Sequence, residues 1–181
     1  LSVAGEHQVL NALSSIALAD AYGISFDNIK DGLKKYTGAN RRLEYKGEFM
    51  GASVYDDYGH HPTEIEATSK AIHKKKYNKS WVIFEPHTYS RAFKHKENFA
   101  KSLKDFDYII ITDIYAAREI NTYGIKEEDI IREIKKYGKE AFHISSYDDI
   151  KLYLSQYVHE GDLILTLGAG NVTKMADLLV K

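Results

Sequence analysis

Residues 56 to 62, Asp-Asp-Tyr-Gly-His-His-Pro, bring two carboxylates, a phenol and two imidazoles close together in the chain. Carboxylate and imidazole groups can together ligate a metal, orient a ribose hydroxyl or transfer a proton. An exposed polar turn is the alternative, since aspartate favours turns and Pro62 suits the first turn of a helix. Because a turn does not require so many functional side chains, we interpret this segment as part of a binding or catalytic site.

Three further segments follow predicted strands. Residues 85 to 91 place Arg91 in the first turn of a predicted helix, where a cation is unfavourable for the helix but suits a bound carboxylate or phosphate. A surface arginine whose stem packs on Tyr89 is the alternative. Residues 113 to 119 pair an acid with a base. Residues 168 to 171 are Gly-rich, which is a weak phosphate-binding signal and also permits a tight strand-to-helix turn.

Two polar pairs lie nearer the N-terminus. His7 and Asn11 are four residues apart and share one helix face, so an imidazole and a carboxamide could together contact a purine ring. A polar stripe on a half-buried helix is the alternative. Arg42, beside Arg41 and Glu44, could meet a phosphate held by another domain or form an interdomain salt bridge.

The elements that position these segments fall into two groups. Apolar residues recur at helical spacing over 6–22 and 27–36, and a loop follows over 37–41. The pattern then changes to strands, so we predict two domains, 1–40 and 41–181. In the second domain the predicted strands are 43–49, 52–55, 81–84, 108–112, 141–144 and 163–167, and the predicted helices are 63–76, 91–103, 126–137, 147–157 and 171–180.

Continuous apolar strands that alternate with amphipathic helices indicate a mostly parallel sheet covered on both faces. With right-handed crossovers, this predicts an α/β, doubly wound, Rossmann-like fold after an N-terminal helical segment. Ligands of such sheets bind beyond the carboxyl ends of the strands. The chemistry is therefore expected in the four strand-end segments.

Composition excludes several functional classes. Lys plus Arg number 25 and Asp plus Glu number 26, a net charge of −1 at pH 7, which argues against a nucleic-acid partner bound by a broad basic face. No apolar run approaches the roughly 18 to 20 residues of a membrane span, so no membrane insertion is expected. The chain has no cysteine and no histidine spacing typical of metal sites, so no metal site is predicted. It also lacks a phosphate loop and a Gly-x-Ser-x-Gly elbow, so it contains no complete catalytic apparatus.

Six blocks, in their order along the chain, resemble the bacterial Mur ligases. They are Gly-Glu-His-Gln-Val-Leu-Asn from residue 5, Arg-Arg-Leu-Glu from 41, the 56–62 block, Pro-His-Thr-Tyr-Ser-Arg from 86, Asp-Ile-Tyr-Ala-Ala-Arg-Glu from 113 and Gly-Ala-Gly-Asn from 168. The blocks from 56 and 86 are the most specific, and the resemblance extends from residue 5 to about residue 174. It implies a three-domain protein in which 1–40 ends the central ATP-binding domain and 41–181 is the complete C-terminal domain. The chain, which begins at Leu1, would then be a piece of a longer polypeptide, with the phosphate loop and the main Mg²⁺ ligands upstream.

The activity that the resemblance implies is ligation in the bacterial cytoplasm, in peptidoglycan precursor synthesis. The pattern is most similar to the branch of the family that joins L-alanine to UDP-N-acetylmuramate with ATP and Mg²⁺ as cofactors. The muramic acid carboxylate would take the γ-phosphate as an acyl phosphate, and the amine of L-alanine would attack it. The partners would be the chain's own N-terminal and central domains, and the fragment alone would be inactive. Alternatives are a ligase that recycles murein tripeptide, and a non-catalytic nucleotide- or amino-acid-binding module.

The resemblance also implies roles for individual residues. For ATP, it implies that the adenine is contacted by His7 and Asn11, the phosphates by Arg42 and the ribose side by Asp57. The L-alanine pocket would be lined by Tyr58, His60 and Arg91, and His60 is the candidate catalytic residue. The chain departs from the family pattern beside that pocket, with Thr88 in place of a frequent second arginine and Glu85 in place of a frequent glutamine.

Overall fold

The computed structural model describes residues 6–36 and 38–181, and for residues 6 and 7 only the backbone is described. The chain divides into two compact units, Leu1–Asn40 and Arg41–Lys181. This division coincides with the change from helical to strand patterning in the sequence. That the first unit ends an ATP-binding domain stays a prediction.

The first unit contains two helices, α1 (Glu6–Ala21) and α2 (Phe26–Lys35). Gly23, at a φ of +75°, lets the chain turn after α1 in a conformation that side chains disfavour. The Ser25 hydroxyl accepts a hydrogen bond from the Asn28 N–H and so caps the start of α2. Both helices begin and end within one residue of the predicted bounds.

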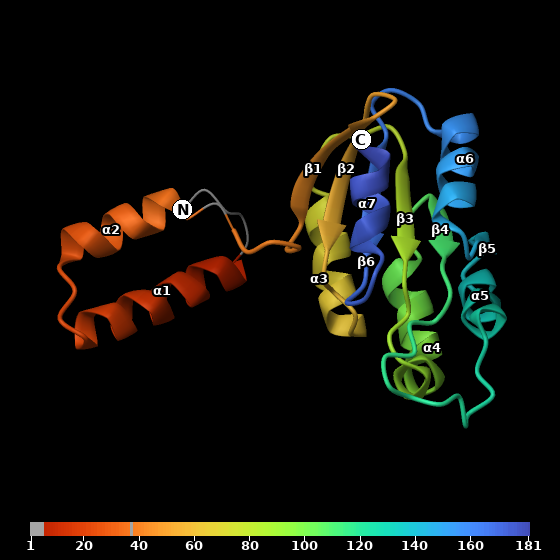
Figure 1. Ribbon diagram of the computed structural model, residues 1–181, viewed down its shortest axis with the longest axis horizontal. Helices are drawn as coiled ribbons and strands as arrows, with labels where there is room; N and C mark the ends of the chain where they lie inside the picture. The colour runs from red at the N-terminus through yellow and green to blue at the C-terminus, as the bar shows by residue number, and fades with distance from the viewer. Residues whose placement is uncertain (1–5, 37) are drawn as a thin grey trace. The chain divides into compact units, whose positions relative to one another are not determined.

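The second unit is built on a six-stranded sheet (Figure 1). The strands are β1 (Glu44–Phe49), β2 (Ala52–Asp57), β3 (Ser80–Phe84), β4 (Tyr108–Ile111), β5 (Ala141–His143) and β6 (Leu163–Leu167), and their spatial order is β1-β2-β6-β3-β4-β5. Only the β1–β2 hairpin is antiparallel, and every other pairing is parallel. The predicted α/β, mostly parallel fold is confirmed.

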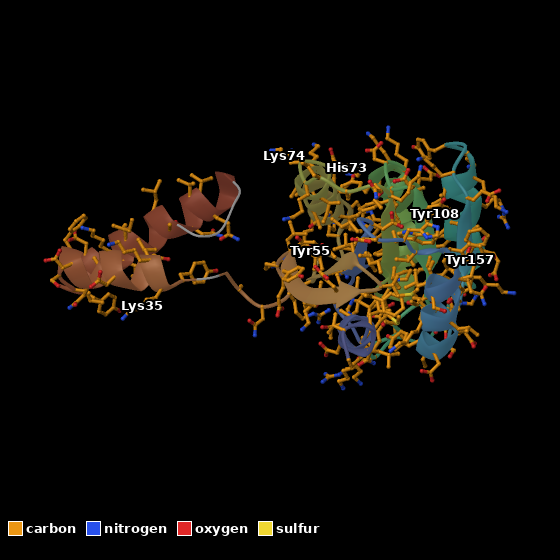
Figure 2. The ribbon with its side chains drawn as sticks, turned by 90° about the horizontal axis from the view of Figure 1, so that it is seen from above. Lys35, Tyr55, His73, Lys74, Tyr108 and Tyr157 are labelled. Carbon is orange, nitrogen blue, oxygen red and sulfur yellow. The ribbon has the colours of Figure 1, made fainter. Side chains whose placement is uncertain are left out.

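Helices cover both faces of this sheet. One core packs α3 (Pro62–Ile72), α4 (Tyr89–Leu103) and α5 (Glu127–Lys135) against side chains such as Phe84. The other packs α6 (Tyr147–Tyr157) and α7 (Thr173–Leu179) against side chains such as Ile83. Successive residues of β3 thus enter opposite cores, which explains why the strand is apolar from Trp81 to Phe84. Figure 2 shows side chains filling the space between sheet and helices; Tyr108, labelled there, belongs to β4.

The sheet order places the polar loops that follow β2, β3 and β6 side by side at the carboxyl edge of the sheet. The carboxyl ends of β2, β6 and β3 are neighbours, and the chain leaves β2 and β3 toward one face but leaves β6 toward the other. Such a change of direction opens a crevice in which ligands of α/β sheets bind. None of the helices among the described residues combines the length and apolarity that crossing a membrane requires.

Candidate functional site

The 56–62 block turns the chain from β2 into α3. Pro62 is the first residue of α3, and the His61 ring accepts a hydrogen bond from the Thr63 N–H. The Glu64 carboxylate completes a capping box by accepting from the N–H groups of His60 and His61, at 3.1 Å each. The turn is therefore rigid, and it orients the side chains on either side of it.

The sequence predicted that the strand ends at residue 55, before Asp56 and Asp57, and this prediction is wrong. β2 continues through both residues, and both side chains are buried. The oxygens of Asp57 accept from the N–H groups of Leu43 and Gly59, at 2.8 Å each. Burial raises the pKa of Asp57, and these two hydrogen bonds oppose that shift. A contact between Asp57 and a ribose stays a prediction.

Asp56 anchors Arg41, the first residue of the second unit. Arg41 Nε lies 3.0 Å from Asp56 Oδ2, while the hydroxyls of Thr166 and Thr173 donate to the same carboxylate at 2.6 and 2.9 Å. Arg41 also donates to the Gly168 carbonyl. We call this arrangement the Arg41 clamp. Sequence reasoning missed it because its partners are far apart in the chain.

Three predicted substrate residues, Tyr58, His60 and Arg91, fall into one row through His87. The His60 ring lies 5.4 Å from the Tyr58 ring and 5.6 Å from the His87 ring, and Arg91 donates to the His87 carbonyl at 2.7 Å. Tyr115 stacks on the His87 ring, with the ring centres 5.3 Å apart. Burial, together with the nearby Arg91 and His60, lowers the pKa of His87, which favours its neutral form. His87 was inside a segment singled out in the sequence but was not among the predicted site residues.

The start of α4 explains how Arg91 is tolerated there. Glu119, from the loop after β4, accepts from the Thr88 and Ser90 hydroxyls at 2.6 Å each and from the Ser90 N–H at 2.8 Å. These hydrogen bonds lower the pKa of Glu119 to about 2. The helix thus receives its N-terminal carboxylate from another loop. Arg91 is only partly exposed, and its guanidinium contacts His87.

Beyond β3, β4 and β6 lies a cavity of about 280 Å³. Glu85, on its wall, is buried; its Oε2 accepts from the Asn171 N–H at 3.2 Å, while Oε1 has no partner among the described residues. Burial raises the pKa of Glu85. A side chain on Gly170 would clash with this carboxylate and with the Tyr115 ring. The Gly-rich turn therefore permits close packing on Glu85, which favours the turn interpretation over a phosphate loop.

The remaining predicted ATP residues are Arg42 in the second unit and Asn11 and His7 in the first. Arg42 is exposed, with its guanidinium 3.7 Å from the Glu64 carboxylate and 5.7 Å from the Tyr58 ring centre. Asn11 is exposed on α1. His7 lies one turn earlier in α1, and its side chain is outside the described part of the chain. The ATP roles of these residues stay predictions.

A mostly parallel α/β sheet with polar turns at its carboxyl edge belongs to the class of folds in which ligands bind at that edge, and comparison with known proteins identifies the family. Residues 41–170 match the family described as "Mur ligase, glutamate ligase domain". The chain belongs to the Mur ligase family.

Particular relatives are more specific. The chain is 44% identical over all 181 residues to a UDP-N-acetylmuramate–L-alanine ligase of Agathobacter rectalis, and 44% identical over the same length to that of Acetivibrio thermocellus. It spans 39% of the length of each. A solved UDP-N-acetylmuramate–alanine ligase from Thermotoga maritima matches 98% of this chain with 38% of its own, at a TM-score of 0.76 and 29% identity. A murein peptide ligase from Psychrobacter arcticus matches 98% of this chain with 37% of its own, at a TM-score of 0.69 and 26% identity.

Proposed function

We propose that this chain is the C-terminal part of an ATP-dependent ligase that joins L-alanine to UDP-N-acetylmuramate in the bacterial cytoplasm. The relatives that match the whole chain at 44% identity carry that activity in their names. Since the chain spans only 39% of their length, the complete reaction needs the preceding domains as partners. We expect the fragment alone to be inactive.

The observation that carries this proposal is the row of Tyr58, His60, His87 and Arg91. It joins two turns that are separate in sequence, at the edge where ligands of this fold class bind. The described contact of the Arg91 guanidinium uses only Nη1, so its other N–H groups can pair with the carboxylate of L-alanine. His60, whose backbone is fixed by Glu64, is the candidate for contact with the reacting amine.

ATP and Mg²⁺ are the proposed cofactors. ATP would activate the muramic acid carboxylate as an acyl phosphate. The exposed guanidinium of Arg42 fits a phosphate contact, because Glu64 holds it only loosely. Exposed Asn11 fits a contact with adenine together with His7, and Asp57 would act at the ribose side. The main Mg²⁺ ligands would lie outside this chain. Closure of the C-terminal domain would exclude water that hydrolyses the acyl phosphate.

The test is ATP-dependent phosphate release by the complete ligase, with UDP-N-acetylmuramate and either L-alanine or murein tripeptide as acceptor. We expect kcat/KM to be at least about a hundredfold higher with L-alanine, which corresponds to roughly 2.7 kcal/mol of discrimination. A preference for the tripeptide would assign the protein to the recycling ligases. Absence of turnover with both acceptors would favour the binding-module alternative.

A further inference from the structure

A second polar cluster lies at the β4–β5 end of the sheet, outside the proposed alanine row. Asp113 follows the end of β4, Glu127 is the first residue of α5 and His143 is the last residue of β5. Each can offer one ligand atom, and these atoms all lie within 4.8 Å of one another. The three residues come from three different elements, so no local spacing in the sequence could reveal the cluster.

Further contacts orient each of the three side chains. The Ile114 N–H donates to Glu127 Oε1 at 2.9 Å, and the Ser145 hydroxyl donates to Asp113 Oδ1 at 2.5 Å. His143 turns Nε2 toward Asp113, at 2.7 Å, while its Nδ1 lies 3.9 Å from a carboxylate oxygen of Glu128. Histidines that bind a metal usually donate the N–H of their other ring nitrogen to a carboxylate, and Glu128 lies near enough to His143 to take that position after a small movement.

The spacing of these atoms suits coordination after small movements. Two donors on a tetrahedral Zn²⁺, each at about 2.1 Å, lie roughly 3.4 Å apart. The Asp113–His143 distance of 2.7 Å is shorter than this, since the two groups now share a hydrogen bond, and the upper limit of 4.8 Å is longer. All three side chains are exposed or half-buried, so they can rotate by these amounts without disturbing the core.

We propose that Asp113, Glu127 and His143 form a binding site for a divalent transition-metal ion of the Zn²⁺ type. One imidazole and two carboxylates suit Zn²⁺ or Co²⁺, whereas Mg²⁺ prefers oxygen ligands alone. Three protein ligands leave a coordination position for water or a small ligand. Asp113 and Ser145 also line the 280 Å³ cavity, so such a ligand could enter from there.

The ion would connect three chain segments at the sheet edge. β5 has only three residues and pairs with β4 alone. A metal bound to Asp113, Glu127 and His143 would hold the end of this short strand to the start of α5 and to the loop after β4. The site shares no residue with the proposed ATP contacts and does not depend on the proposed ligase activity.

The experiment is titration of the chelator-treated 181-residue chain with Zn²⁺ by calorimetry and with Co²⁺ by visible absorption. We expect one ion per chain, with a Kd in the micromolar range, and a Co²⁺ band typical of low coordination number. Mg²⁺ at the same concentration should not compete. His143→Ala should weaken Zn²⁺ binding at least tenfold. Glu127→Gln, which can keep the Ile114 hydrogen bond, should do the same and serves if His143→Ala does not fold.

The matched control is His95→Ala. The His95 ring lies 5.2 Å from that of His61, so these two imidazoles are the competing place for an adventitious ion. We expect His95→Ala to bind as the parent chain does. Loss of binding in His95→Ala but not in His143→Ala or Glu127→Gln would overturn the proposal. So would the absence of saturable binding by the parent chain up to about a hundred times the expected Kd.

Discussion

The Arg41 clamp makes a quantitative prediction about stability. The Asp56 side chain has no exposed surface, whereas the Arg41 side chain is 21% exposed. Arg41→Met keeps most of the aliphatic stem but leaves a buried carboxylate without its counter-charge. Breaking a buried ion pair in this way costs about 3–5 kcal/mol, and the partial exposure of Arg41 places the expected loss near 3 kcal/mol. At about 2–4 °C per kcal/mol for domains of this size, the Tm should fall by roughly 9 °C.

The assay is urea unfolding of the 181-residue chain followed by tryptophan fluorescence. The chain has a single tryptophan, Trp81, which is buried in β3, so the signal reports the second unit. The matched control is Arg42→Met. Arg42 is exposed and its ion pair with Glu64 is long, at 3.7 Å, so this variant should lose less than about 1 kcal/mol of unfolding free energy. A double-mutant cycle with Asp56→Asn should show coupling above about 1 kcal/mol. A loss below about 1 kcal/mol for Arg41→Met would refute the reasoning.

Three further predictions concern the candidate site. Arg91→Ala in the complete ligase should raise the KM for L-alanine about ten- to a hundredfold, the value of one charged hydrogen bond, and leave the KM for ATP within about twofold; Lys94→Ala is the control, and an unchanged alanine KM would remove Arg91 from the pocket. Burial raises the pKa of Glu85 above 4.5, so the contribution of its protonated carboxyl to folding stability is fully present below pH 4.5. That contribution is lost as pH rises through the raised pKa. Urea unfolding at several pH values should therefore show the unfolding free energy of Glu85→Gln increasing relative to that of the parent between pH 4.5 and pH 8. A difference in unfolding free energy that does not change with pH would contradict this. The pKa of Glu119 is lowered to about 2, so its stabilisation is present above pH 4.5 and is lost as pH falls toward 2; Glu119→Gln should be less stable than the parent at pH 7, and in thermal melts that gap should close on acidification rather than persist.

Most of the fold could be predicted because its two central strands, β3 and β6, are buried on both faces. Residues 81–84 are a continuous apolar run and residues 163–167 are apolar except for Thr166, and such runs favour a central parallel strand. The start of α2 was predicted one residue after its observed start at Phe26, from the apolar spacing alone. The end of β2 was placed too early because its last two residues are charged. Their burial depends on Arg41, Leu43 and Gly59, which periodicity does not report.

The candidate site was predictable only as a set of segments. The segments that contain Tyr58, His60 and Arg91 stood out because reactive side chains follow predicted strands, whereas the assignment of these three residues to an alanine pocket came from the family resemblance and stays a prediction. The sheet order brings the two strand ends together. The roles of Glu85, Glu119 and His87 were missed, since each depends on a partner from another loop. A carboxylate that caps a distant helix looks, in sequence, like any surface acid.

The cap on α4 has a consequence for the order of folding. Thr88 makes no side-chain cap of its own, and the carboxylate that accepts the Ser90 N–H arrives with the loop after β4. The first turn of α4 is therefore completed only after β4 has paired with β3, although α4 precedes β4 along the chain. During synthesis the helix would emerge with a frayed start. The polypeptide that follows it would then complete both the helix and the turn that presents Arg91.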